Sequence, residues 1–171
     1  MTNKNFVEEL IDLVDKNDAI LGSVARSKAN LDPNLIHREI AIIIFDKENR
    51  VLLQRRSLNK KTDPGVWTVS CAGHVTHGLT PLQVAHKELM EEVGFDTDLE
   101  FFEKEFSQLS TESRFFYWYT GKFPENVIIK MEPEEVINTK FIAKEELENF
   151  QKAGNTIGQH SLRYLTKFWS R

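Results

Sequence analysis

Two kinds of hydrophobic periodicity alternate along the chain. Short runs rich in β-branched and aliphatic residues indicate buried strands at 39–45 and 51–55, and the polar residues 46–49 between them are typical of a hairpin turn. The run of aromatic residues at 115–119 is interpreted as core. Further strands are expected at 67–70, 101–106, 114–120 and 136–142, and further helices at 145–152 and 158–170.

The clearest local signal predicts a helix that begins after Thr80 and is stopped by Gly94. Thr80 can cap it, Pro81 suits the first helical position, and Gln83 completes a Thr-x-x-Gln capping box. Apolar residues at spacings of three and four form a stripe that we expect to pack on a sheet. The stripe consists of Leu82, Ala85, Leu89 and Val93.

The first 36 residues allow two interpretations. Phe6 and Val7 begin a helical spacing that continues through Leu10, Ile11 and Val14, whereas the apolar segments on either side of 15–18 are typical of a hairpin. We favour the hairpin, packed with its following loop on a single domain that spans 1–171. The mixture of strands and helices predicts an α+β fold with a mixed sheet sandwiched by helices.

Composition excludes several classes of protein. The 22 Lys and Arg nearly balance 26 Asp and Glu, so a net charge of −4 leaves no basic surface for nucleic acid. The longest apolar run, 40–45, is far shorter than the ~20 residues that span a bilayer, and the polar opening 1–5 does not resemble a secretory signal. We therefore expect a cytoplasmic protein. With one cysteine and no zinc-type spacing of histidines, we expect any metal to be held by oxygen.

Three carboxylates, Glu88, Glu91 and Glu92, share one face of the predicted helix because they stand at i, i+3 and i+4. A solvated acidic face is one interpretation of this pattern. The other is a site for a hard cation, since the preceding loop contains Gly73 and Gly78, where a backbone can approach a ligand closely. Magnesium is the cation that bridges carboxylates to phosphates.

The segment from Gly73 to Phe95 resembles the Nudix box, G-x5-E-x7-R-E-U-x-E-E-x-G-U, where U is a bulky aliphatic residue. Leu79 and Lys87 replace the Glu and Arg that are thought to pair in the family. The matching positions are Gly73, Glu88, Leu89, Glu91, Glu92 and Gly94. The resemblance implies a Nudix-type α/β/α sandwich with a mixed β-sheet between helices. It also implies a hydrolase that cleaves a diphosphate bond in a nucleoside diphosphate derivative or related small metabolite.

The same resemblance implies roles for particular residues. Mg²⁺, with Mn²⁺ as a possible substitute, would be held by Gly73, Glu88, Glu91 and Glu92. The catalytic candidates are Glu91, Glu92 and Glu135, the last because an acidic residue in that region often assists metal or water in the family. Strand-end guanidinium groups can clamp a phosphate, and histidines can line the pocket. The candidates for substrate binding are Arg55, Arg56, His37, His74 and Lys87.

Segments outside the box resemble the Nudix branch related to isopentenyl diphosphate isomerase, which raises a rival chemistry. These segments are 15–26, 37–38, 54–57 and 64–68, and the start of the box itself, 73–75, adds to the resemblance. The isomerase has a cysteine immediately before its Gly-His pair. Here that position is Ala72, and Cys71 should point to the opposite side of its strand.

A catalytically silent nucleotide-binding domain is the third alternative, because Leu79 and Lys87 depart from the motif. In each case we expect a small-molecule diphosphate ligand and no nucleic-acid or membrane partner, in a monomer or homodimer.

Overall fold

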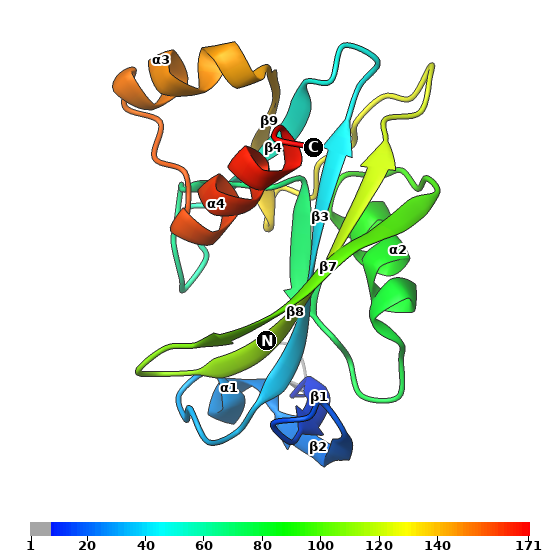
Figure 1. The fold of residues 1–171 in the computed structure, drawn as a ribbon, viewed down its shortest axis with the longest axis vertical. Coiled ribbons are helices and arrows are strands. Elements are labelled where there is room, and N and C mark those ends of the chain that lie inside the picture. The colour runs from blue at the N-terminus through cyan, green and yellow to red at the C-terminus, as the bar shows by residue number, and fades with distance from the viewer. Residues whose placement is uncertain (1–7) are drawn as a thin grey trace, which may run out of the picture.

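The computed structural model describes residues 8–171, which form a mixed sheet between helical layers (Figure 1). The α+β class is thereby confirmed. The sheet has nine strands: β1 (Leu10–Val14), β2 (Ile20–Ala25), β3 (His37–Phe45), β4 (Val51–Arg56), β5 (Trp67–Thr68), β6 (Cys71–His74), β7 (Leu99–Gln108), β8 (Ser113–Lys122) and β9 (Val136–Ile142). The helices are α1 (Arg26–Ala29), α2 (Pro81–Glu92), α3 (Leu147–Lys152) and α4 (Gln159–Phe168). A 3₁₀ turn at Lys144–Glu146 precedes α3.

Strand β3 organises the sheet because it pairs with four others. It is antiparallel to β1, β4 and β6 and parallel to β8. Its register places Ile40 opposite Gly73 of β6 and Ala41 opposite both Ala72 of β6 and Trp118 of β8. The pairing with β3 therefore fixes the position at which the loop after β6 begins.

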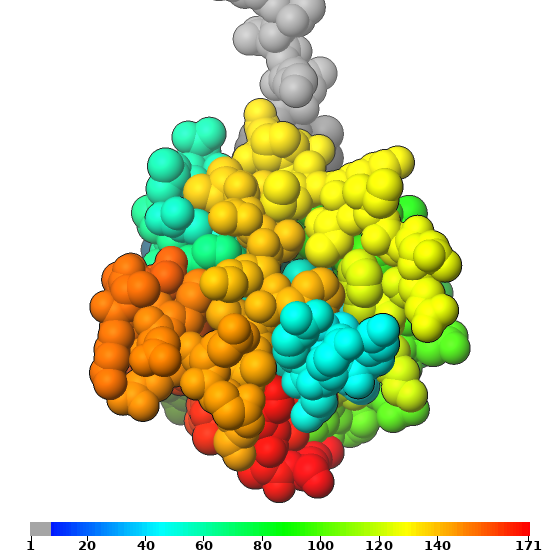
Figure 2. Space-filling view, turned by 90° about the horizontal axis from the view of Figure 1, so that it is seen from above, coloured from blue at the N-terminus to red at the C-terminus, as the bar shows by residue number. Residues whose placement is uncertain are grey.

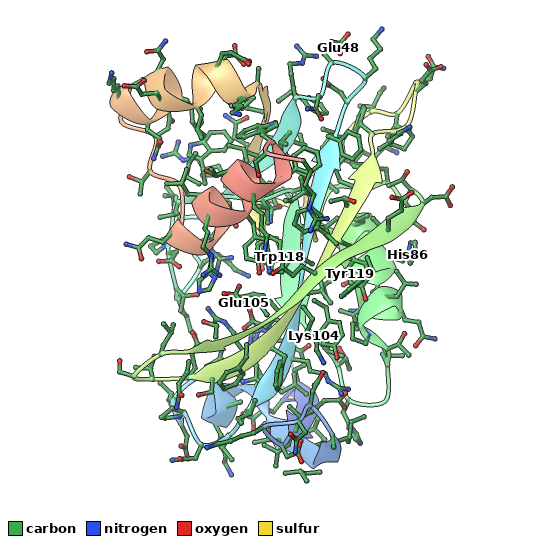
Figure 3. All side chains as sticks on the ribbon, viewed as in Figure 1. Glu48, His86, Lys104, Glu105, Trp118 and Tyr119 are labelled. Atoms are coloured by element: carbon green, nitrogen blue, oxygen red, sulfur yellow. The ribbon has the colours of Figure 1, made fainter. Side chains whose placement is uncertain are left out.

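The two faces of the sheet carry separate hydrophobic cores, and side-chain alternation along each strand assigns residues to them. Ile40, Ile42 and Ile44 of β3 lie in the core that α2 covers, together with residues of that helix. In β8 the faces separate in the same way (Figure 3): Trp118 stacks on Tyr164 of α4, with ring centroids 3.7 Å apart, whereas Tyr119 belongs to the α2 side. The aromatic run 115–119 is thus core, as predicted.

The N-terminal hairpin is confirmed. Asp15 caps its turn by accepting hydrogen bonds from the backbone N–H groups of Asn17 and Ala19, each at 2.8 Å. Arg38 of β3 fixes the hairpin to the sheet, because its guanidinium donates to Asp18 at 2.6 Å and to Asp12 at 3.2 Å. Phe6 and Val7, which began the alternative helical spacing, lie outside the described residues.

Two local expectations differ from the structure, and one short helix was not expected. The strand expected at 67–70 ends at Thr68, and a separate strand, β6, begins at Cys71, because Ser70 bonds through its side chain to the backbone of Ile44 and Leu52 in neighbouring strands. Leu82 of the expected apolar stripe is 40% exposed, and Val84 is buried instead. Helix α1 carries no periodic pattern because it has only four residues.

The C-terminal residues close the fold against the β3–β4 turn. Trp169 donates from Nε1 to the carbonyl of Asn49 at 3.1 Å, and Figure 2 shows the turn beside the C-terminal segment. Across residues 8–171 we find no helix with the length and apolarity needed to cross a membrane.

Candidate active site

Helix α2 positions the three carboxylates. Its capping box is present: the Thr80 side chain accepts from the Gln83 N–H at 3.3 Å, and the Gln83 side chain accepts from the Thr80 N–H at 2.9 Å. Glu92 is buried, and the side chain of Glu88 is only 17% exposed. Only Glu91 of the three is well exposed, at 57%. The interpretation as a fully solvated acidic face is therefore excluded for two of the three side chains.

Gly73 allows Glu88 to approach the sheet. A Cβ atom at position 73 would lie 2.8 Å from Cδ of Glu88, which is closer than such contacts occur in proteins. Because Gly73 pairs with Ile40 of β3, its position is fixed and cannot relax away from the helix. A glycine is therefore required here for Glu88 to occupy its position against β6.

Glu92 is held by two donors. Gln54 of β4 donates to its Oε2 from Nε2 at 3.0 Å, and the thiol of Cys71 donates to the same oxygen at 3.1 Å. Burial, with Glu92 beside it, raises the pKa of Cys71 well above its ordinary value, so the thiol keeps its proton. Cys71 thus lies on the α2 side of β6, as the alternation along the strand predicts.

The nearby cations balance the buried carboxylates only in part. Burial and the neighbouring charge of Glu92 raise the pKa of Glu88 to about 7. Burial also raises the pKa of Glu92, although its bonds to Cys71 and Gln54 oppose the change. Two desolvated carboxylates side by side form an oxygen-rich, electron-rich donor set of the kind that Mg²⁺ prefers. The residues present therefore fit a hard divalent cation.

The structure accommodates both departures from the motif, Leu79 and Lys87, through other contacts. Lys87 Nζ lies 3.0 Å from Oε2 of Glu91 and 3.8 Å from Oε1 of Glu88. Burial opposes its charge, but these carboxylates raise its pKa overall. Leu79 packs against the α2-side core. A lysine–glutamate pair on α2 and an apolar contact therefore stand where the family pattern has one ion pair.

One large cavity of about 1380 Å³ gathers most of the candidates. Arg55 and His37 are absent from its lining: Arg55 donates to the Gly65 carbonyl at 3.0 Å, and His37 is fully buried. The lining includes Lys60, which the sequence analysis missed although it follows two arginines at the end of β4; it pairs with Glu135. The predicted residues that line the cavity are Arg56, Gly73, His74, Lys87, Glu88, Glu91, Glu92 and Glu135.

A second group of possible metal ligands, which spacing did not reveal, lies on β3 and β6. His37, Glu39 and His74 place ligand atoms within 4.8 Å of one another, because Glu39 and His74 are paired across the two strands. Burial lowers the pKa of His74 to about 4, so it is neutral at pH 7. Arg114 Nη1 lies 3.3 Å from Glu39 and supplies a cation to this group from the protein itself.

Solved structures and sequence relatives place these features in a known family. The fold matches that of the DR0079 protein from Deinococcus radiodurans with a TM-score of 0.79 and 20% identity, over 94% of this chain and 99% of that one. Residues 35–164 match the model of the NUDIX domain, and the chain belongs to the Nudix family.

The sequence relatives include both hydrolases and isomerases. A Nudix hydrolase of Listeria monocytogenes, itself uncharacterized, is 31% identical over 90% of this chain and 91% of its own length. An isopentenyl-diphosphate Δ-isomerase of Streptomyces griseus is 31% identical over 81% of this chain and 73% of its own length. Membership of the family favours a hydrolase that acts on a small molecule, while the branch contains two chemistries.

We predict that Glu88→Gln stabilises the metal-free protein at pH 8. Glu88 has a raised pKa in the folded state, so the folded protein binds more protons than the unfolded chain between about pH 4.5 and 7, and stability falls as pH rises through this window. The loss amounts to about 2–3 kcal/mol. Urea unfolding in EDTA at pH 5 and pH 8 measures it, and the variant should lose most of the difference.

Glu91→Gln is the matched control, because Glu91 is exposed and contributes less than burial and Glu92 to the raised pKa of Glu88, so this variant should keep most of the decline. If the Glu88→Gln variant keeps the full wild-type decline in the free energy of unfolding between pH 5 and pH 8, the decline does not come from a raised pKa of Glu88.

We also predict that Leu79→Glu does not raise turnover. Lys87 is already engaged with Glu91, and a carboxylate at position 79 would enter an apolar core without a partner. Stability should fall by about 1–3 kcal/mol. Thermal unfolding and initial rates measured on the same preparation test both parts, and a gain in turnover would contradict the interpretation of Leu79 as an accommodated apolar contact.

Proposed function

We propose that the protein is a Mg²⁺-dependent hydrolase, with Mn²⁺ as a possible substitute, that cleaves the diphosphate bond of a nucleoside diphosphate derivative or related small metabolite. The observation that carries the proposal is the buried pair Glu88 and Glu92, which opens onto a cavity that also contains basic side chains. A carboxylate pair with unrelieved repulsion is costly to keep unless a cation binds there.

In this proposal the cation is held by Glu88, Glu91 and Glu92 with the backbone of Gly73. When bound, Mg²⁺ neutralises phosphate oxygens and stabilises the charge that develops on the attacked phosphorus. The diphosphate is oriented by the basic side chains of the lining, and guanidinium and ammonium groups both suit this task. They are Arg56, Lys60 and Lys87.

Glu135 is the proposed general base. It lies in the same cavity as Glu92, its side chain is 39% exposed, and Lys60 pairs with it. A carboxylate that lines the cavity can accept a proton from the attacking water. Glu91 is the alternative base, since it has a comparable pairing with Lys87.

The three remaining binding candidates take different positions in the proposal. His74 lines the cavity as a neutral ring, so it can donate or accept a hydrogen bond to the substrate. Arg55 and His37 would act indirectly: Arg55 through the loop at Gly65, and His37 through Glu39, 3.4 Å from its Nε2.

The second candidate function is isomerisation of an isoprenoid diphosphate. The isomerase relatives favour it. The position of the cysteine opposes it: Ala72 lines the cavity, whereas Cys71 is buried outside the lining and its thiol is engaged with Glu92. A third possibility, a silent nucleotide-binding domain, is opposed by the retention of all three box carboxylates.

We infer that the chain is a single Nudix domain, monomeric or homodimeric, that works in the cytoplasm on a small molecule without nucleic-acid or membrane partners. Location, assembly and the extent of the domain stay predictions.

We predict that Glu92→Gln lowers turnover by about two orders of magnitude or more with the fold retained, because it removes a formal charge from the cation's ligands. The assay panel contains nucleoside di- and triphosphates, dinucleotides and isopentenyl diphosphate, each with Mg²⁺ and with EDTA. Phosphate and nucleoside monophosphate release report hydrolysis, and deuterium incorporation from D₂O into the isopentenyl chain reports isomerisation.

Hydrolysis that requires Mg²⁺ and is lost in Glu92→Gln would support the proposal. Deuterium incorporation without hydrolysis would transfer the assignment to the isomerase. Equal turnover by Glu92→Gln would remove Glu92 from the site, and circular dichroism of each variant provides the control for folding.

A further inference from the structure

Two buried side chains contact Glu92 from outside the cavity. Gln54 of β4 and Cys71 of β6 come from different strands, and both are buried. Glu92 lines the cavity, whereas Gln54 and Cys71 are not among the described residues that line it. Any effect of these two side chains on a bound group therefore has to act through Glu92.

Both side chains donate to the same oxygen of Glu92. Gln54 Nε2 lies 3.0 Å from Oε2, and Sγ of Cys71 lies 3.1 Å from it. In the part of the chain that the structure describes, no donor bonds to the other oxygen, Oε1. The carboxylate is therefore asymmetric: the protein occupies one oxygen and leaves the other without a donor.

The hydrogen bonding of Gln54 indicates that this side chain serves Glu92. Its amide oxygen is buried and has no hydrogen-bond partner within residues 8–171. An unsatisfied buried polar atom costs about 1–3 kcal/mol, which an apolar side chain of the same length would avoid. The bond to Glu92 is the one side-chain hydrogen bond that Gln54 makes in the described residues. Holding Glu92 is therefore the role that accounts for a glutamine at this position.

The number of oxygens that a carboxylate offers affects which cation it suits. Ca²⁺ takes about 6–8 oxygen ligands and accepts a carboxylate through one oxygen or through both. Mg²⁺ is smaller, requires near-ideal octahedral geometry and keeps several of its waters. A carboxylate that offers a single oxygen therefore suits Mg²⁺, and it withholds from Ca²⁺ the two-oxygen contact that this ion can use.

We propose that Gln54 and Cys71 are positioning residues that set the cation preference of the site: by occupying Oε2 of Glu92, they restrict this ligand to one oxygen and favour Mg²⁺ over Ca²⁺. The inference rests on the proposed function, because that function places a divalent cation at Glu88 and Glu92. It adds two residues that contact neither the cation nor the substrate. Removal of one donor leaves the other in place, so the effects of the two should accumulate.

Binding of the metal ions alone tests the proposal without turnover. Mg²⁺ and Ca²⁺ each compete with Mn²⁺, whose electron paramagnetic resonance signal reports the unbound ion, and loss of Mn²⁺ binding in Glu92→Gln identifies the measured site. The quantity compared is the ratio of the Ca²⁺ Kd to the Mg²⁺ Kd. The double variant Gln54→Met, Cys71→Ala removes both donors, and its ratio should fall about tenfold or more below that of the wild type. Each single variant should show part of this fall.

Two controls separate positioning from packing. Cys71→Ser keeps a donor at position 71, so it should keep the wild-type ratio, whereas Cys71→Ala lowers it. Val84→Ala shortens a fully buried apolar side chain of the same core, so it should lower stability and leave the ratio unchanged. Thermal unfolding of each metal-free variant checks the fold, and the single variants carry the test if the double variant does not fold.

The proposal is overturned if the variants that lack a donor keep the wild-type ratio, or if Cys71→Ser lowers the ratio as far as Cys71→Ala does. Its failure is distinct from failure of the hydrolase. Mg²⁺-dependent hydrolysis with an unchanged ratio in the variants would retain the hydrolase and reject the positioning role. A lowered ratio in a protein that hydrolyses no member of the assay panel would do the reverse, and a wild type that binds none of the three ions would reject both.

Discussion

The enforced proximity of Glu88 and Glu92 in a desolvated position is the constraint on which the site depends. Burial disfavours the charged form of each carboxylate. The raised pKa of Glu88 reflects the free-energy cost of burying that charge beside Glu92. The helix is held there by contacts that do not involve the carboxylates: the capping box at Thr80 and the apolar side chains of Val84, Ala85 and Leu89. The capping box and the apolar contacts of α2 thus hold its buried, mutually repelling carboxylates in place. Such an opposition between fold and site is what a preorganised cation site requires.

The central strand β3 extends this constraint to the rest of the cavity. Its pairing with β6 fixes Gly73 opposite Ile40, which sets how closely Glu88 can approach. Its pairing with β8 places Phe116 and Trp118 on the side of the sheet opposite α2. Both ends of the cavity therefore depend on the register of one strand. A slip of one residue would exchange the two faces and destroy both ends together.

Local signals explain why so much of the fold was predictable. The capping box at Thr80 to Gln83 and the stop at Gly94 act within a few residues, and the helix forms where they place it. The break between β5 and β6 was not predictable, because it depends on where the hydroxyl of Ser70 finds backbone partners 18 and 26 residues away. The same limit applies to the site. The box carboxylates are close in sequence, whereas Lys60 meets Glu135 across 75 residues, and His37, Glu39 and His74 converge only through strand pairing.

The position of the cysteine on β6 bears on the choice between the two candidate chemistries. Successive residues of a strand point to opposite sides, so a cysteine one position before Ala72 bonds to Glu92 of α2 and does not line the cavity. In this chain the thiol of Cys71 keeps its proton and donates a hydrogen bond to Oε2 of Glu92, while Ala72 presents only a methyl group to the cavity. A methyl group can neither donate nor accept a proton. Proton transfer to a carbon chain would therefore have to come from other groups of the lining.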